Sequence, residues 1–149
     1  MKAAALLSAI LFYVACVGTA WASGTLSELK DNGQELGGHT FTITSKPLPT
    51  GAVQFHLRIS DETGEFDPRF DHASLGIVTI VHRVSEHVSD IRKLPLEKGD
   101  HSLACDFTVE KEDLGNPDFC FIYTRTSRDR MPGVDFIFAR LKKFSGAGP

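Results

Sequence analysis

The sequence has no excess of positive charge and no long apolar segment beyond its first residues. Its 16 lysines and arginines stand against 19 acidic residues, which gives a formal net charge of −3. Nucleic acids and anionic membranes both call for a basic face, so the charge argues against either as the main partner. After Ser23 no apolar run approaches the roughly 20 residues of a membrane-spanning helix. We therefore expect no membrane span.

Common catalytic motifs are missing as well. The chain contains no G-x-S-x-G, no G-x-G-x-x-G, no P-loop and no H-E-x-x-H. These absences remove the sequence signals of serine hydrolases, dinucleotide enzymes, nucleoside triphosphatases and zinc proteases. A carboxylate pair can still be assembled by the fold, so an enzyme is left open. The sequence favours a protein that is not an enzyme.

Residues 1–22 have the organisation of a secretory signal peptide. A basic start at Lys2 precedes an apolar run, and Ala20-Trp21-Ala22 has the small-x-small pattern that signal peptidase recognises. Cleavage before Ser23 would place the protein outside the cytoplasm, either secreted or periplasmic. The sequence does not distinguish a bacterial from a eukaryotic source.

The signal-peptide assignment places one of the three cysteines in the signal and two in the mature chain. Cys16 lies inside the signal, where Tyr13-Val14-Ala15-Cys16 faintly resembles a bacterial lipobox, so a lipid anchor at Cys16 is an alternative to cleavage before Ser23. Cys105 and Cys120 remain in the mature chain, in a compartment that favours disulfides. No C-x-x-C redox motif is present. We predict a structural Cys105–Cys120 disulfide that stabilises the fold by about 3 kcal/mol.

Alternation of apolar and polar residues is the main structural signal after residue 38. Residues 51–60 alternate strictly, which is the period of a half-buried strand. Alternating or fully apolar strand patterns also cover residues 40–44, 75–81, 90–96, 103–109, 119–123 and 134–139. Turn-forming residues separate these segments, and no long helix is indicated. About seven short strands predict an all-β fold, an antiparallel β-sandwich with either an immunoglobulin-like Greek key or a jelly roll.

This pattern predicts a single domain over residues 39–144. Residues 23–38 are rich in Ser, Gly, Asp and Asn, and we expect a flexible N-terminal segment there. Residues 145–149 are expected to form a disordered tail. The aromatic face of residues 119–123 is interpreted as core rather than as a sugar-binding platform.

Candidate binding residues lie in the loops. If the strands alternate in direction, loops 61–73, 96–100 and 127–133 share one end of the sandwich. We expect this end to hold a protein or another polar ligand of unknown identity, through side chains that form ion pairs and bidentate hydrogen bonds. These side chains are Asp67, Arg69, Asp71, His72, Arg128 and Arg130. The alternative is that the charges only hydrate this end and pair with one another.

The acidic loop also raises a metal-binding alternative. Its closely spaced carboxylates are the hard oxygen ligands that calcium selects, although the D-x-[DN]-x-[DN]-G spacing is missing. Imidazole suits zinc and copper, and a fold that gathers two histidines beside an aspartate would create such a site. The candidate ligands are Asp61, Glu62, Glu65, Asp67, Asp71, His72 and His101.

Together these observations predict a secreted or periplasmic, non-catalytic binding module that uses the loops at one end of a β-sandwich. An extracytoplasmic protein that binds divalent metal through the acidic loop 61–72 is the alternative. The sequence sets neither the strand order nor the oligomeric state.

Overall fold

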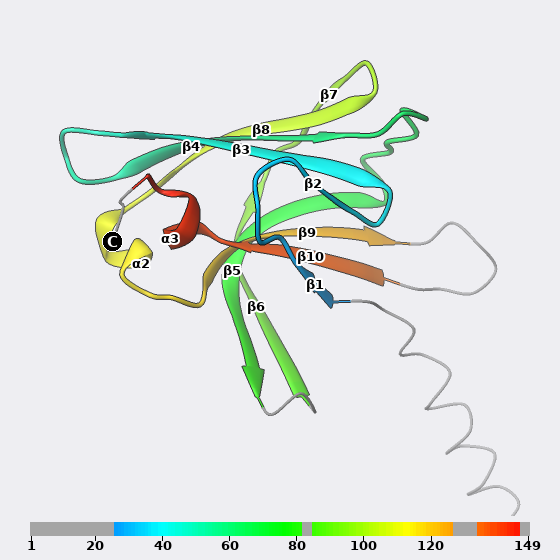
Figure 1. Cartoon of the computed structure of the whole chain (residues 1–149). Coiled ribbons are helices and arrows are strands. Elements are labelled where there is room, and N and C mark those ends of the chain that lie inside the picture. The colour runs from blue at the N-terminus through cyan, green and yellow to red at the C-terminus, as the bar shows by residue number, and fades with distance from the viewer. Residues whose placement is uncertain (1–25, 82–84, 127–133, 147–149) are drawn as a thin grey trace, which may run out of the picture.

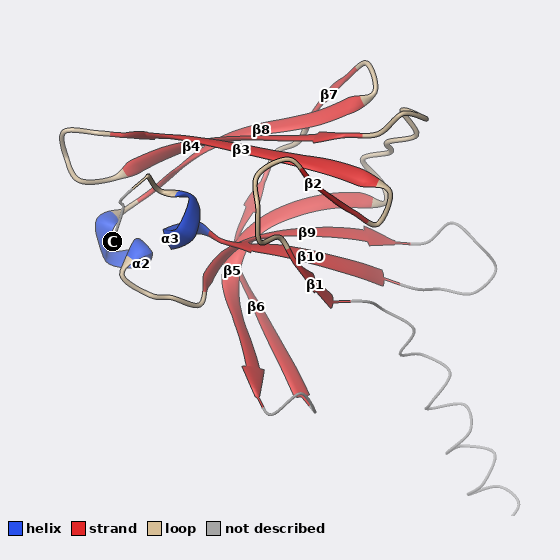
Figure 2. Cartoon of the chain, in the orientation of Figure 1, coloured by secondary structure: helices blue, strands red, loops and turns tan. Residues whose placement is uncertain are grey.

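The structure is a computed structural model that describes residues 26–81, 85–126 and 134–146. In these residues two sheets of five strands each pack against one another, with two short helices at one end (Figure 1). The predicted all-β fold class is therefore confirmed, and strands dominate the described chain (Figure 2). Within the same residues, no helix has the length and apolar character needed to cross a lipid bilayer.

Sheet A has the strand order β1-β10-β9-β5-β6, and sheet B has the order β2-β3-β4-β8-β7. The strands of sheet A are β1 (Leu26–Glu28), β10 (Val134–Arg140), β9 (Phe119–Thr126), β5 (Asp71–Val81) and β6 (Ser85–Leu94). The strands of sheet B are β2 (Gln34–Leu36), β3 (His39–Pro47), β4 (Val53–Ser60), β8 (Ser102–Val109) and β7 (Glu97–Gly99). The helices are α2 (Lys111–Leu114) and α3 (Leu141–Phe144).

One apolar core lies between the two sheets. In β4 the side chains of Phe55, Leu57 and Ile59 are buried, while the residues between them face solvent. The rings of Phe55, Phe107 and Phe121 stack in series, with centroids 5.4 and 5.9 Å apart. This series links sheet B to sheet A, since Phe121 belongs to β9. The predicted core position of the β9 aromatic face is confirmed, and burial of this apolar surface is the main source of stability.

The segment before β3 is more ordered than its composition indicates. The sequence predicts a flexible segment over residues 23–38, whereas the structure places β1 and β2 within it. Leu29 is buried in the core, and its N–H donates to the Phe138 carbonyl at 2.8 Å. Asn32 Oδ1 accepts the Ile43 N–H at 2.8 Å. These are single, non-periodic contacts, so hydrophobic periodicity could not indicate them.

The predicted Cys105–Cys120 disulfide is wrong, because both thiols are free. Cys105 in β8 points into the core between the sheets. Cys120 in β9 points to the opposite face of sheet A, where it packs with Val78, Ile122 and Phe138. Its two neighbours in β9 face the core, so strand alternation turns Cys120 away. Burial raises the pKa of both thiols to about 12, which keeps them protonated and unreactive.

A β-bulge accompanies the bend of β5 and β6 away from the rest of sheet A (Figure 1). The β5–β6 register shifts between Leu75 and Gly76. A Cβ atom on Gly76 would lie 2.4 Å from the Ser89 carbonyl oxygen and 2.7 Å from Ile122 Cδ1. No side chain fits there without a shift of the backbone. Glycine is therefore required at this position of the β5–β6 pair.

Candidate binding site at the loop end

The end of the molecule opposite the helices brings together the 61–70 loop and the β7–β8 turn (Figure 1). The Asp61 N–H donates to the His101 carbonyl at 3.1 Å, and Lys98 Nζ donates to the Phe66 carbonyl at 2.8 Å. Loops 61–73 and 96–100 thus meet at one end, as the sequence predicts. The third predicted loop, residues 127–133, lies outside the described residues.

Local hydrogen bonds and one aromatic side chain fold the 61–70 loop. Asp61 Oδ1 accepts both the Thr63 N–H at 2.7 Å and the Thr63 hydroxyl at 2.9 Å, which forms an Asx turn. Gly64 has a φ of +64°, a conformation that glycine adopts without strain. Phe66 is 2% exposed and its ring centroid lies 5.4 Å from that of His39. The loop is therefore an ordered part of the core.

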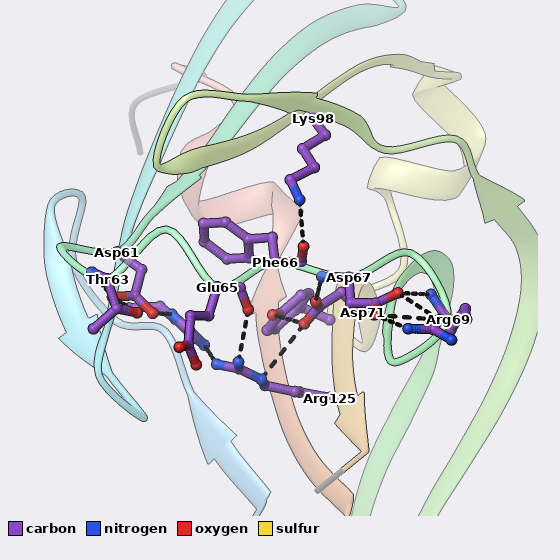
Figure 3. Close-up of polar contacts among 11 residues, drawn as sticks. Asp61, Thr63, Glu65, Phe66, Asp67, Arg69, Asp71, Lys98 and Arg125 are labelled. Carbon is purple, nitrogen blue, oxygen red and sulfur yellow. Dashed lines mark hydrogen bonds and ion pairs between the residues drawn. The ribbon is translucent and has the colours of Figure 1, made fainter. Parts of the chain in front are cut away.

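Side chains from three strands hold the backbone of this loop (Figure 3). Arg125 Nη2 in β9 donates to the Glu65 carbonyl at 3.0 Å, and Lys98 in β7 donates to the carbonyl that follows it. Asp71 Oδ2 in β5 accepts the Asp67 N–H at 2.6 Å. We call these three contacts the loop clamp. Because the sheets fix the three strands, the loop clamp fixes the loop.

The Asp71 carboxylate is buried and is held by β9. Its Oδ1 accepts the Tyr123 hydroxyl at 2.6 Å and lies 3.7 Å from Arg125 Nε. Asp71 and Arg125 are direct cross-strand partners between β5 and β9. Burial first, and the Asp71 carboxylate second, raise the pKa of Tyr123 far above its ordinary value. The hydroxyl therefore stays protonated and donates to a carboxylate that would otherwise be costly to bury.

His39, the first residue of β3, completes this buried network. Its side chain is 2% exposed, and its Nε2 lies 2.6 Å from Arg125 Nη1. A guanidinium only donates, so Nε2 accepts and the proton of the neutral ring is on Nδ1. Nδ1 lies 3.2 Å from Asp61 Oδ2, without the alignment of a hydrogen bond. Burial, and then the charge of Arg125, lower the pKa of His39, so the ring is neutral at neutral pH.

A polar groove of about 520 Å³ lies beside the 61–70 loop. It is bounded by the loop, by β2 to β4 and by the β7–β8 turn, and its lining residues are Glu35, Gly38, Thr40, Arg58, Ser60, Asp61, Glu62, Thr63 and His101. The ring of His101 packs against the loop at Gly64. A Cβ atom added to this glycine would lie 2.7 Å from His101 Nδ1. The groove therefore has charged and hydroxyl groups around a fixed rim.

Four of the residues predicted for partner binding are described, and they lie within or directly after the 61–70 loop. Asp67 and Arg69 pair within the loop, with Arg69 Nη2 2.7 Å from Asp67 Oδ2. His72 is exposed in β5, whereas the next residue toward the loop, Asp71, is buried in the network. Arg128 and Arg130 lie outside the described residues.

Sequence reasoning missed the buried network of this end, in which Arg125 contacts His39 and Tyr123 donates to Asp71. A signal for it was present in the alternation, since His39 has the parity of the buried Phe41 in β3. Arg125 likewise has the parity of the core residues of β9. A charged or imidazole side chain at an inward position of a strand indicates a buried polar network.

The predicted metal ligands are not gathered either. Among the described residues, no three His, Cys, Asp or Glu side chains are placed to hold a metal ion. Asp61 is engaged by Thr63 and Asp67 by Arg69, and the Asp71 carboxylate is enclosed by the network. Glu62 and His101 line the groove, but Glu65 and His72 do not.

Comparison with known proteins finds no match to this chain among family models, curated proteins or solved structures. The charged side chains that line the groove can pair with charges of a ligand, and the hydroxyl groups can donate and accept hydrogen bonds. The buried network, with His39 and Tyr123 enclosed, holds the rim in place.

Proposed function

We propose that this protein is a secreted or periplasmic binding module without catalytic activity, which holds a protein partner in the groove at the loop end. The observation that supports this most is the loop clamp beside the groove. A rim that is already fixed loses little conformational entropy when a partner binds. The signal-like residues 1–22 support the compartment.

The charges around the groove suit a protein surface that carries both signs. Glu35, Arg58 and Glu62 all line the groove and are exposed. A partner carboxylate would accept bidentate hydrogen bonds from Arg58, and a partner lysine or arginine would pair with a glutamate. Charge patterns of this kind give specificity and fast association.

We further propose an immunoglobulin-like Greek key for the architecture. Immunoglobulin-like domains place strands A, B and E in one sheet and strands C, F and G in the other. The sheet B order β3-β4-β8 corresponds to A-B-E, and the sheet A order β10-β9-β5 corresponds to G-F-C. This correspondence favours the immunoglobulin-like arrangement over a jelly roll. It fits the proposed function, since such scaffolds hold binding loops at their ends.

Affinity capture with paired variants tests the groove. The groove variant is Arg58→Ala with Glu62→Ala, and the control is Lys111→Ala with Glu112→Ala in α2 at the opposite end. All four side chains are exposed, so we expect both variants to melt with the wild type. The extracytoplasmic fraction of the source organism is the sample.

The wild type and the α2 control should capture the same discrete protein, and the groove variant should capture it at least about tenfold less well, as for an interface hot spot. Equal capture by both variants would contradict binding in the groove. Loss of capture in the α2 control alone would contradict it as well.

A further inference from the structure

His39 lies where the loop clamp meets the buried network, and it positions Arg125. Nη1 of this arginine faces His39 Nε2 at 2.6 Å, Nη2 faces the Glu65 carbonyl at 3.0 Å and Nε faces Asp71 at 3.7 Å. The guanidinium offers donors alone and keeps its charge. The arrangement therefore requires His39 Nε2 to be without a proton. A proton there would set one N–H donor against another at hydrogen-bond distance.

Charged and titratable groups face His39 from several elements. Arg125 and the ring of Tyr123 come from β9, Asp61 from the 61–70 loop, Asp71 from β5 and Asp135 from β10. The three carboxylates favour an imidazolium, whereas the guanidinium opposes it. A protonated His39 would keep an anionic partner in Asp61 and would repel Arg125. The same groups therefore allow two arrangements: a neutral His39 that accepts from Arg125, and a charged His39 that pairs with Asp61.

We propose that protonation of His39 opens the loop clamp: the imidazolium pairs with Asp61, Arg125 leaves the Glu65 carbonyl, and the loop beyond Asp61 detaches from the ends of the strands. Glu62 and Thr63 line the groove directly after Asp61, so opening displaces this part of its wall. Acidification then releases a bound partner. The release of a partner rests on the proposed function, but the opening of the loop does not.

The direction of the pH effect follows from the burial of His39. Desolvation first, and Arg125 second, lower the pKa of His39 below its ordinary 6.5, while Asp61, Asp71 and Asp135 act in the opposite direction. A detached loop exposes the ring, which then binds a proton more readily than in the closed state. The closed state is therefore favoured above pH 6.5 and loses stability as the pH falls through the lowered pKa.

Amide hydrogen exchange tests the opening without any partner. The protein expressed from the full-length sequence is followed by mass spectrometry from about pH 7.5 to about pH 4.5, with correction for intrinsic exchange rates. Exchange within residues 61–70 should rise by at least about tenfold on acidification, while β4 and β8 keep their protection. Uniform acceleration of the whole chain, or none in the loop, would overturn the proposal.

Variants separate the titration of His39 from general acid effects. His39→Gln retains an acceptor for Arg125 without a titratable ring, so its loop should stay protected at low pH. His72→Gln removes an exposed histidine outside the loop clamp and should open like the wild type. If both variants behave alike, the proposal fails.

Asp61→Asn keeps the test decisive should His39→Gln not fold. It removes the carboxylate that favours the imidazolium, so the midpoint of opening should move to lower pH. An unchanged midpoint would contradict the proposed role of His39. Partner capture at both ends of the pH range distinguishes the two proposals: absence of capture at neutral pH rejects the proposed function, whereas the exchange of the loop decides the opening by itself.

Discussion

Asp71 joins the 61–70 loop to β9 at the loop end. Its two carboxylate oxygens serve different elements: Oδ1 accepts from Tyr123 in β9, and Oδ2 accepts from the backbone of the 61–70 loop. The nearby pair of Asp67 and Arg69 differs in kind, because the Arg69 side chain is 80% exposed. Exposed pairs of this type add little to stability. Asp71 therefore joins two elements, whereas the contacts of Asp67 with Arg69 stay within the loop.

Removal of the Tyr123 hydroxyl should be costly. Tyr123→Phe leaves Asp71 Oδ1 without its 2.6 Å donor in a buried site, so the free energy of unfolding should fall by about 1–3 kcal/mol. Denaturant unfolding followed by circular dichroism measures the change. Ser74→Ala is the control, since it deletes a hydroxyl that donates to the exposed Asp90 at 2.7 Å. A Tyr123→Phe protein as stable as the control would contradict the role given to Asp71.

Part of this network could be predicted from the sequence. The alternation in β3 and β9 places His39 and Arg125 on the inward face, so the direction of both side chains could be predicted from the sequence. Their mutual contact was not, because β3 and β9 belong to different sheets. The side-chain partners of Asp71 depend in the same way on the path of the 61–70 loop, which local residue patterns do not set.

Among the elements, the 61–70 loop behaves as part of the core although its composition is that of a surface loop. Eight of its ten residues are Asp, Glu, Thr, Gly, Pro or Arg, and the other two are Phe66 and Phe70. Phe66 nevertheless fills the space between the two sheets at this end. Two aromatic residues four positions apart in a polar loop give no strand-like alternation, so the sequence could not show that this loop is anchored through Phe66.

Truncation of this anchor should destabilise the whole domain. Phe66→Ala removes a side chain that is 2% exposed, so the free energy of unfolding should fall by about 3–5 kcal/mol. Glu62→Ala, in the same loop, removes an exposed side chain and should change it by no more than about 0.5 kcal/mol. Equal melting temperatures for the two variants would show that the loop is not anchored through Phe66.

The β-bulge in β5 predicts that a side chain at Gly76 destabilises the protein. Gly76→Ala forces a Cβ atom to within 2.4 Å of the Ser89 carbonyl oxygen, so the β5–β6 pair must shift and the protein should lose about 1–3 kcal/mol of stability. Gly115→Ala is the control, because its nearest contact would be 3.1 Å, to the Glu112 carbonyl oxygen. Thermal unfolding compares the two. A larger loss in Gly115→Ala would contradict the account of the bulge.

For the whole molecule, period-two alternation was sufficient to predict an all-β fold, and two five-stranded sheets bear this out. It was not sufficient for strands that are apolar on both faces. Cys120 lies in such a strand, and the face to which it points depends on the second apolar cluster, on the side of sheet A away from sheet B. The predicted disulfide failed for this reason.

The two sheets are therefore held together by the core and not by a covalent bond. Alkylation in denaturant without a reductant should modify both Cys105 and Cys120, because both thiols are free. The melting temperature should also be the same with and without a reductant. A peptide in which Cys105 is joined to Cys120 would contradict this result, and so would a melting temperature that falls on reduction.

Site-specific photo-crosslinking tests the central claim, that partners bind at the loop end. One protein carries a photoreactive amino acid in place of Glu62 at the groove, and a second carries it in place of Lys111 in α2 at the other end. Illumination in the extracytoplasmic fraction of the source organism should give a discrete adduct from position 62 and none from position 111. An adduct from position 111 alone, or equal adducts from both, would contradict the account.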